Sequence, residues 1–331
     1  MGGNAIKMSE RIPKEKFFEY ASIIKPLIEK AFDTKVHMVT SFKNKEDFGD
    51  LDLLVLENHN FDNRVKIVED LFSPEETDKN SHIYSFNYEN LQVDLIFTPE
   101  ENWETSKIFF QHGDLGNLMG KIINNYGHLA NHDIHLKYGY DGLKVKFLYK
   151  GNSKNVFITK DNKKVFEFLG LDFTKWEEGF NDKYEMFDYV VKAYYFDYNA
   201  FQWDNLNHIN KKRNARRPNY IEFLEYIENH RNYVEYAPVS SIYLSRLKEF
   251  FNVDIQSEFD KFKSDININK EVSEKFNGKL VMEVMPYLKG KELGDALKGF
   301  KESKNDWNDF ILNNNIYFIT ENFKEWYNGV R

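Results

Sequence analysis

The chain has 331 residues, of which 41% are hydrophobic, and it carries a formal net charge of −8 and no cysteine. This length favours about two domains. The absence of cysteine excludes disulfides, thiol nucleophiles and zinc–cysteine sites and fits a reducing compartment. The negative charge disfavours tight, sequence-independent binding of long duplex DNA. With neither a membrane-length apolar stretch nor a signal-peptide core, we expect a cytoplasmic protein without a membrane partner.

The first hundred residues predict helices mixed with strands. Residues 14–32 form an amphipathic pattern, in which Phe17, Ile24 and Ile28 recur at helical spacing. The patterns that follow predict a short strand at 36–41, a strand from Asp50 through Leu56, a helix at 61–72 and a hairpin with strands at 82–86 and 91–97.

Beyond residue 100 the apolar spacing is mostly helical, apart from a predicted hairpin at 144–159. We expect helices at 103–126, 161–169, 182–196, 219–228, 239–251, 256–263, 291–302 and 306–313. The predicted fold class is α+β, with a mixed sheet flanked by helices and then a helical C-terminal domain. The expected divisions are 1–100, 101–197 and 198–331.

Three carboxylates interrupt strands that otherwise look buried. Asp50 and Asp52 lie two residues apart, so they project from the same face of a strand. Asp94 lies among apolar residues of a strand that would run alongside the first. Because ionised carboxylates are strongly disfavoured in such surroundings without a cation, the pattern favours a site for two Mg²⁺ ions, or Mn²⁺, that hold a nucleoside triphosphate.

These residues resemble the signature of the polymerase β nucleotidyltransferase superfamily: Gly-Ser, a gap, Asp-x-Asp, and a third Asp on a later strand. Ser41, Lys43 and Gly49-Asp50-Leu51-Asp52 are most similar to the family X DNA polymerase version. The resemblance implies a nucleotidyltransferase palm in residues 1–100, with Asp50, Asp52 and Asp94 as catalytic metal ligands. It also implies that Thr40, Ser41, Lys43 and Gly49 hold the triphosphate, although Thr40 stands where a glycine is usual.

The segment Phe110–Asn117 is similar to the family X segment that contacts the sugar and base of the incoming nucleotide. The resemblance implies that Gly113 and Asn117 bind nucleotide. In that family an aromatic residue helps to exclude ribose, and Gly116 stands at the matching place. We therefore expect NTPs to be used at least as well as dNTPs. A weaker resemblance, at Met285–Leu297, is to the C-terminal body of tRNA nucleotidyltransferases.

The densest basic cluster lies at residues 211–217, just before the helix expected to start at Pro218. Its cations either form a solvated basic turn or contact the phosphates of a nucleic acid; we favour the second because the overall charge is opposite. The residues predicted to contact nucleic acid are Lys211, Lys212, Arg213, Arg216 and Arg217.

Together these features predict a metal-dependent nucleotidyltransferase that transfers NMP from an NTP to the 3′-hydroxyl of a nucleic acid, RNA such as tRNA ahead of DNA. Three alternatives stay open. They are a gap-filling DNA polymerase, a nucleotidyltransferase that acts on a small molecule or protein, of the antibiotic-resistance or toxin type, and an inactive nucleotide-binding scaffold.

Overall fold

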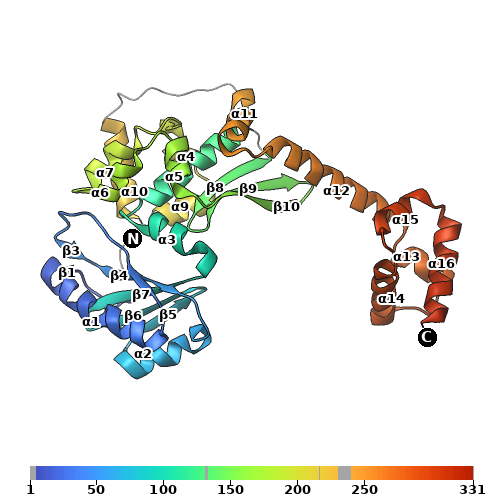
Figure 1. Ribbon diagram of the computed structural model, residues 1–331, viewed down its shortest axis with the longest axis horizontal. Coiled ribbons are helices and arrows are strands. Elements are labelled where there is room, and N and C mark those ends of the chain that lie inside the picture. Colours follow the sequence, from blue (N-terminus) through green and yellow to red (C-terminus); the bar gives the residue numbers. More distant parts are fainter. Residues whose placement is uncertain (1–4, 131–132, 216, 230–239, 331) are drawn as a thin grey trace. The chain divides into compact units, whose positions relative to one another are not determined.

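The computed structural model describes residues 5–130, 133–215, 217–229 and 240–330, and divides into two compact units (Figure 1). The larger unit comprises Met1–Phe147 and Asn155–Val253, and the smaller comprises Leu148–Lys154 and Asp254–Arg331. The division therefore falls near residue 253 and differs from the expected one at 198. The helices between these positions belong with the larger unit because they pack on its earlier helices, as α11 does on α4.

The fold is α+β, and a mixed five-stranded sheet fills the N-terminal part of the larger unit. The strand order is β2-β4-β7-β6-β5, in which β4 and β7 run parallel and the other described pairs run antiparallel. The elements are β1 (Ile12–Pro13), α1 (Lys14–Phe32), β2 (Val36–Met38), β3 (Asp47–Phe48), β4 (Asp50–Leu56), η1 (Phe61–Asn63), α2 (Arg64–Phe72), β5 (Thr77–Asn80), β6 (Ile83–Tyr88) and β7 (Leu91–Thr98).

The two faces of this sheet differ because side chains alternate along each strand. Helices α1 and α2 cover one face (Figure 1), where Leu51, Leu53 and Val55 of β4 are fully buried. Asp50 and Asp52 alternate with these residues and therefore point to the opposite face. The expected helix at 14–32 and the expected strand ending at Leu56 are both confirmed.

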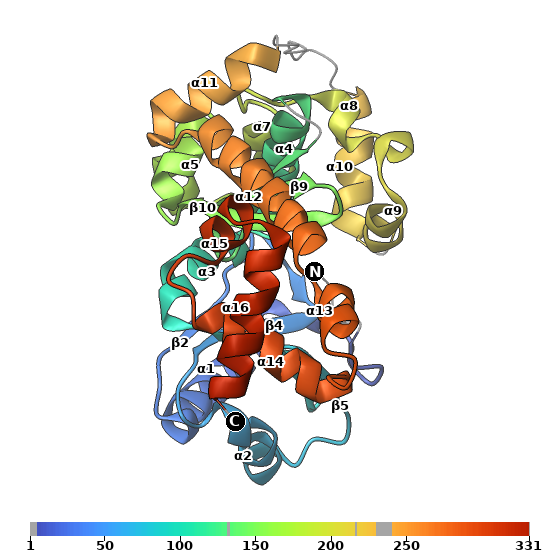
Figure 2. The same ribbon diagram turned by 90° about the vertical axis from the view of Figure 1, so that its right-hand side faces the viewer.

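Helix α4 is central to the rest of the larger unit, where it packs on β8, α7, α8 and α11 (Figure 2). The elements here are η2 (Glu100–Asn102), α3 (Trp103–Phe110), α4 (Leu115–Ala130), β8 (Ile134–Gly139), β9 (Gly142–Tyr149), β10 (Asn152–Thr159), α5 (Asn162–Phe168), α6 (Phe173–Glu178), α7 (Lys183–Val190), α8 (Tyr198–Phe201), η3 (Trp203–Asn205), α9 (His208–Asn214), α10 (Pro218–Asn229) and α11 (Ser240–Phe251). The expected hairpin is the β9–β10 pair, and β8 completes a three-stranded sheet.

Helix α7 ends at Val190, six residues before the end expected from the apolar spacing. The chain turns there, and the backbone N–H of Tyr194 donates to the carbonyl oxygen of Leu169 at 2.8 Å. The N–H groups of Lys192 and Ala193 bond three residues back, and that of Tyr194 bonds to the loop after α5 instead of to Val190.

The smaller unit is helical and has its own core. It contains α12 (Ile255–Lys275), α13 (Gly278–Val284), α14 (Gly290–Glu302), α15 (Trp307–Asn313) and α16 (Ile316–Gly329). Phe300, Ile311 and Phe323 lie at the centre of its core. The hairpin tip belongs here because Lys150 Nζ donates to Asn267 Oδ1 of α12 at 2.8 Å. Among the described residues, none of the helices combines the length and apolar character needed to cross a membrane.

Candidate metal centre

The three aspartates meet on the face of the parallel β4–β7 pair that lies opposite α1 and α2. Asp52 and Asp94 pair directly in the register, and Asp50 lies two residues before Asp52 on the same face of β4. One carboxylate oxygen from each residue lies within 4.8 Å of the corresponding oxygens of the other two. Among the described residues this is the only such group of potential ligands. Oxygen ligands at this separation fit hard divalent cations such as Mg²⁺.

The electrostatics of the cluster also fit a cation. Burial raises the pKa of all three carboxyls, and for Asp52 the neighbouring charges of Asp50 and Asp94 raise it further. The pKa of Asp94 rises to about 6. Crowded acidic groups in a dry setting resist ionisation unless positive charge compensates them. A divalent cation would supply that charge and hold all three ionised.

Sequence reasoning missed two residues that hold Asp94 in place. The Gln92 amide Nε2 donates to both carboxylate oxygens of Asp94 at 2.9 Å, and Ser85 of β6, its partner in the register, also hydrogen-bonds to it. The amide Oε1 of Gln92 accepts from the backbone N–H groups of Ala5 and Ile6 at 3.1 Å. Asp94 is therefore oriented by a buried glutamine that the N-terminal segment fixes.

The segment of residues 40–46 between β2 and β3 is called the 40–46 loop. It includes three of the residues predicted to bind triphosphate. The carbonyl oxygen of Thr40 accepts from the His112 N–H at 3.0 Å, and the Thr40 hydroxyl donates to Gln111 Oε1 at 2.6 Å. The backbone N–H of Lys43 donates to the Phe180 carbonyl at 3.0 Å. Thr40 and Lys43 are exposed and Ser41 is half-buried, while Gly49 is buried just before β4.

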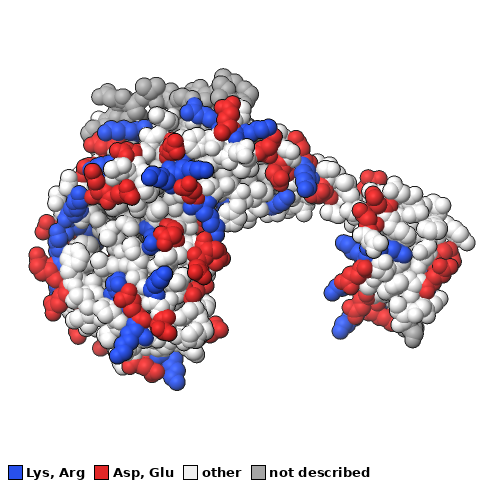
Figure 3. All heavy atoms as spheres, in the orientation of Figure 1, with Lys and Arg blue, Asp and Glu red and all other residues white. Residues whose placement is uncertain are grey.

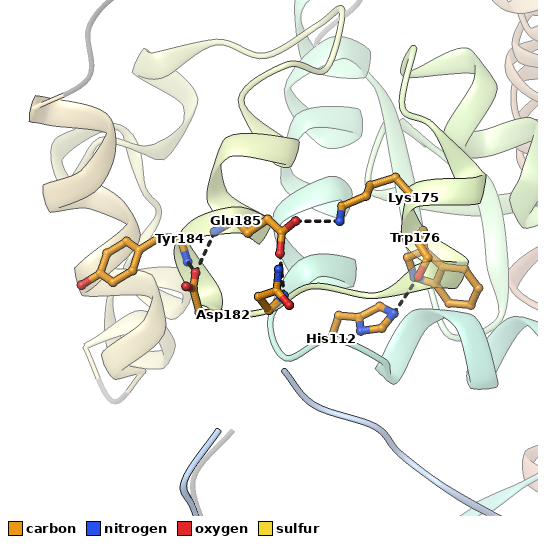
Figure 4. Close-up of polar contacts among 7 residues, drawn as sticks. His112, Lys175, Trp176, Asp182, Tyr184 and Glu185 are labelled. Carbon is orange, nitrogen blue, oxygen red and sulfur yellow. Dashed lines mark hydrogen bonds and ion pairs between the residues drawn. The ribbon is translucent and has the colours of Figure 1, made fainter. Parts of the chain in front are cut away.

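A polar cluster supports the segment on which this loop rests (Figure 4). Glu185 accepts from Lys175 Nζ at 2.6 Å and from the backbone N–H of Asn181, while Asp182 caps the first turn of α7. His112 Nε2 lies 3.0 Å from the carbonyl oxygen of Trp176, so it carries the proton and donates. Burial lowers the pKa of His112 to about 4, which keeps the ring neutral at neutral pH.

Lys45 is a second cation of the 40–46 loop, and its proximity to the carboxylates was not expected. Its Nζ lies 4.5 Å from the centre of the Phe48 ring. Burial lowers its pKa, and the nearby charges of Asp50 and Asp52 oppose that shift. The sequence placed Lys45 in the loop but gave no sign of which lysine turns inward.

The segment at 113–117 is held by the basic cluster. Asp114 is buried and forms an ion pair with Arg217 at 3.3 Å. Asn117 donates to Asp114 Oδ1 at 3.2 Å and accepts from Arg213 Nη2 at 3.0 Å. Two of the five predicted nucleic-acid cations, Arg213 and Arg217, thus already have partners within the protein.

The other predicted contacts lie on or beside this segment. Gly113 adopts a left-handed conformation with a φ of 68°, and an added Cβ would come within 3.3 Å of Phe42. Lys211 and Lys212 lie on α9, half-buried and exposed respectively. Arg216 lies outside the described residues.

Gly116 has a structural reason to be glycine. A Cβ there would lie 2.3 Å from the carbonyl oxygen of Phe109, the penultimate residue of α3. The missing side chain therefore points into the α3–α4 contact. This packing accounts for the glycine without any reference to a sugar, and the expected use of NTPs stays a prediction.

Comparison with models of known protein families and with curated proteins finds no match for this chain.

Proposed function

We propose that the chain is a metal-dependent nucleotidyltransferase of the polymerase β type and that its five-stranded sheet is the palm. The observation that carries the proposal is the convergence of Asp50, Asp52 and Asp94 on one face of a parallel strand pair. Burial and mutual repulsion make this cluster costly unless it holds cations. The 40–46 loop begins two residues after β2 and returns towards the carboxylates at Lys45.

In this proposal the three carboxylates hold two Mg²⁺ ions. When bound, these ions would neutralise charge on the triphosphate and activate the acceptor hydroxyl. The terminal phosphates are bound by Ser41 and by the side chains of Lys43 and Lys45, because the backbone N–H groups of residues 43–45 already donate to carbonyl oxygens of the protein. The acceptor oxygen forms a bond to the α-phosphorus, the bond to the β-phosphate oxygen breaks, and pyrophosphate leaves. Asp94 accepts the proton of the hydroxyl.

The proposed acceptor is the 3′ end of an RNA. Lys211 and Lys212 on α9 support this choice, since neither forms an ion pair within the described part of the chain. A small-molecule or protein acceptor is the second candidate, because Arg213 already donates to Asn117 and Arg217 already forms an ion pair with Asp114. In addition, cationic and anionic side chains alternate over the visible face of the larger unit (Figure 3).

The experiment that tests the reaction incubates the protein with labelled NTPs and Mg²⁺, first with total RNA and then with primed DNA. Asp52→Asn should lower turnover by roughly a thousandfold or more, since losing a metal ligand removes several kcal/mol of transition-state stabilisation. Asp70→Asn, on the exposed surface of α2, is the matched control and should leave turnover unchanged. Near-normal turnover by Asp52→Asn at saturating Mg²⁺ would refute the proposal.

A further inference from the structure

A basic pocket lies between α4, β8, α9 and α10 in the larger unit. Its volume is about 250 Å³, and four cationic side chains line it against a single carboxylate, that of Asp114. The cations are Lys121, Lys137, Arg213 and Arg217. This concentration of positive charge occurs in a protein whose net charge is −8. The one carboxylate is already paired with Arg217.

Lys121 is the least compensated of these cations. Its Nζ lies 5.9 Å from the centre of the Phe201 ring and 5.7 Å from that of Tyr220. Within the described part of the chain it makes no ion pair and no hydrogen bond. Burial lowers its pKa to about 8, with no acidic neighbour opposing the shift. A partly buried ammonium without an anion costs stability, so an anion that entered the pocket would offset that cost.

The pocket continues into a second hollow of about 500 Å³ that shares Lys121, Asn124 and Asn210 with it. Amide side chains dominate this extension, with Asn125, Asn199, Asn205 and Asn207 in its wall. The wall also contains the carboxylate of Asp197, which accepts from Asn125 Nδ2 at 2.9 Å. Amides both donate and accept hydrogen bonds, as the sugar hydroxyls and base edges of a nucleotide do. The arrangement offers a cation for one phosphate, and amide groups with the Asp197 carboxylate for the sugar hydroxyls and the base of the same nucleotide.

We propose that Lys121 marks a binding site for the phosphate of a nucleotide unit, with the sugar and base in the asparagine-lined extension. Asn117, Arg213 and Arg217 of its wall are among the residues predicted to bind nucleotide or nucleic acid. None of its residues belongs to the carboxylate cluster, however, so binding here needs neither the metal ions nor the proposed reaction. A phosphodiester of an RNA strand and a phosphomonoester of a free mononucleotide share the required chemistry.

The test uses the full chain with EDTA, so that divalent cations cannot hold nucleotides at the carboxylates. Lys121→Met keeps the packing of the side chain but removes the charge. It should weaken the binding of AMP and of a short labelled oligoribonucleotide by about tenfold, the effect of one charge-assisted contact. Lys66→Met, which changes an exposed lysine of α2, is the matched control. Lys121→Arg should restore binding.

Thermal denaturation separates binding from a structural role. AMP should raise the Tm of the wild type but not that of Lys121→Met, and without ligand the variant should be the more stable of the two. Equal binding of both ligands by a folded Lys121→Met overturns the proposal, as does a loss of binding that Lys121→Arg fails to restore. If AMP binds as tightly as the oligoribonucleotide, the natural ligand of the site is a free nucleotide. If only the oligoribonucleotide binds tightly, the natural ligand is an RNA strand.

Discussion

The raised pKa values of the three aspartates, Asp94 among them, make the proposed binding of Mg²⁺ depend on pH. The pKa of Asp94 in the folded protein is about 6 because of burial, above the unfolded value of about 3.9. The folded state therefore binds the extra proton between these values, and without metal this group's contribution to stability falls as pH rises through that window. Mg²⁺ needs the ionised form, so it should raise the Tm more at about pH 7.5 than at about pH 5. Differential scanning fluorimetry with EDTA or Mg²⁺ measures this, and Asp94→Asn should remove the difference.

Gln92 should act on the metal through Asp94. Gln92→Leu removes the amide that bonds both carboxylate oxygens, and loss of such a supporting contact costs about 10–100-fold in metal affinity or activity. We expect the Mg²⁺ concentration for half-maximal turnover to rise by that order. Gln256→Leu breaks a comparable Gln–Asp contact on the exposed surface of α12 and should change nothing. An unshifted Mg²⁺ requirement would make Gln92 merely structural.

How far the sequence predicted the site differs from residue to residue. Side-chain alternation placed Asp50 and Asp52 on one face, and the strand pattern suggested that Asp94 lies beside them; the register confirms both. The same alternation puts Gln92 on that face, so its position beside Asp94 could have been predicted from the sequence. Ser85 could not be predicted in this way, because its place depends on the register of the expected hairpin, in which Tyr88 pairs with Leu91 and Ser85 therefore lies opposite Asp94.

At the scale of elements, the 40–46 loop is held from outside its own strands. Gly113→Ala tests this coupling, because a left-handed φ costs an alanine roughly 1–2 kcal/mol and its Cβ would press on Phe42. We expect lower stability together with a raised KM for NTP. Gly290→Ala carries similar backbone strain, with a φ of 57° and no atom within 4 Å of the added Cβ. It should lower stability alone, and an equal KM in both variants would argue against the coupling.

Element boundaries were predicted where a local signal exists and missed where contacts decide. Helix α10 begins at Pro218, as its start signal indicated. Helix α12 continues to Lys275, twelve residues beyond the expected end, through a largely polar stretch that lacks the apolar repeat used to find helices. The packing of α11 on α4 is a long-range contact without a periodic signature, so the division near residue 253 could not be found from the sequence.

At the scale of the whole molecule, nucleic-acid binding should depend on few cations. Lys211→Ala with Lys212→Ala should weaken RNA binding and make the slope of log K against log salt shallower by up to about two. The arginines are poorer probes, because removing Arg217 leaves Asp114 buried without its partner. Lys298→Ala with Lys301→Ala, on α14 of the smaller unit, is the control. An unchanged slope would favour the small-molecule or protein acceptor.

Several partners of the 40–46 loop lie far from it in the sequence, which matters for how the protein folds during its synthesis on the ribosome. The strands that carry the aspartates are complete once residue 98 has emerged, and domains fold from the N-terminus as they are made. Lys14 bonds to the backbone of Lys43 and Glu46. The other described partners of the loop backbone outside the loop are His112, Phe180 and Asn181. Under the proposed function, a nascent chain would gain the ability to hold cations before it could hold a triphosphate, and reaction with nucleotides would wait until more than half of the protein is made.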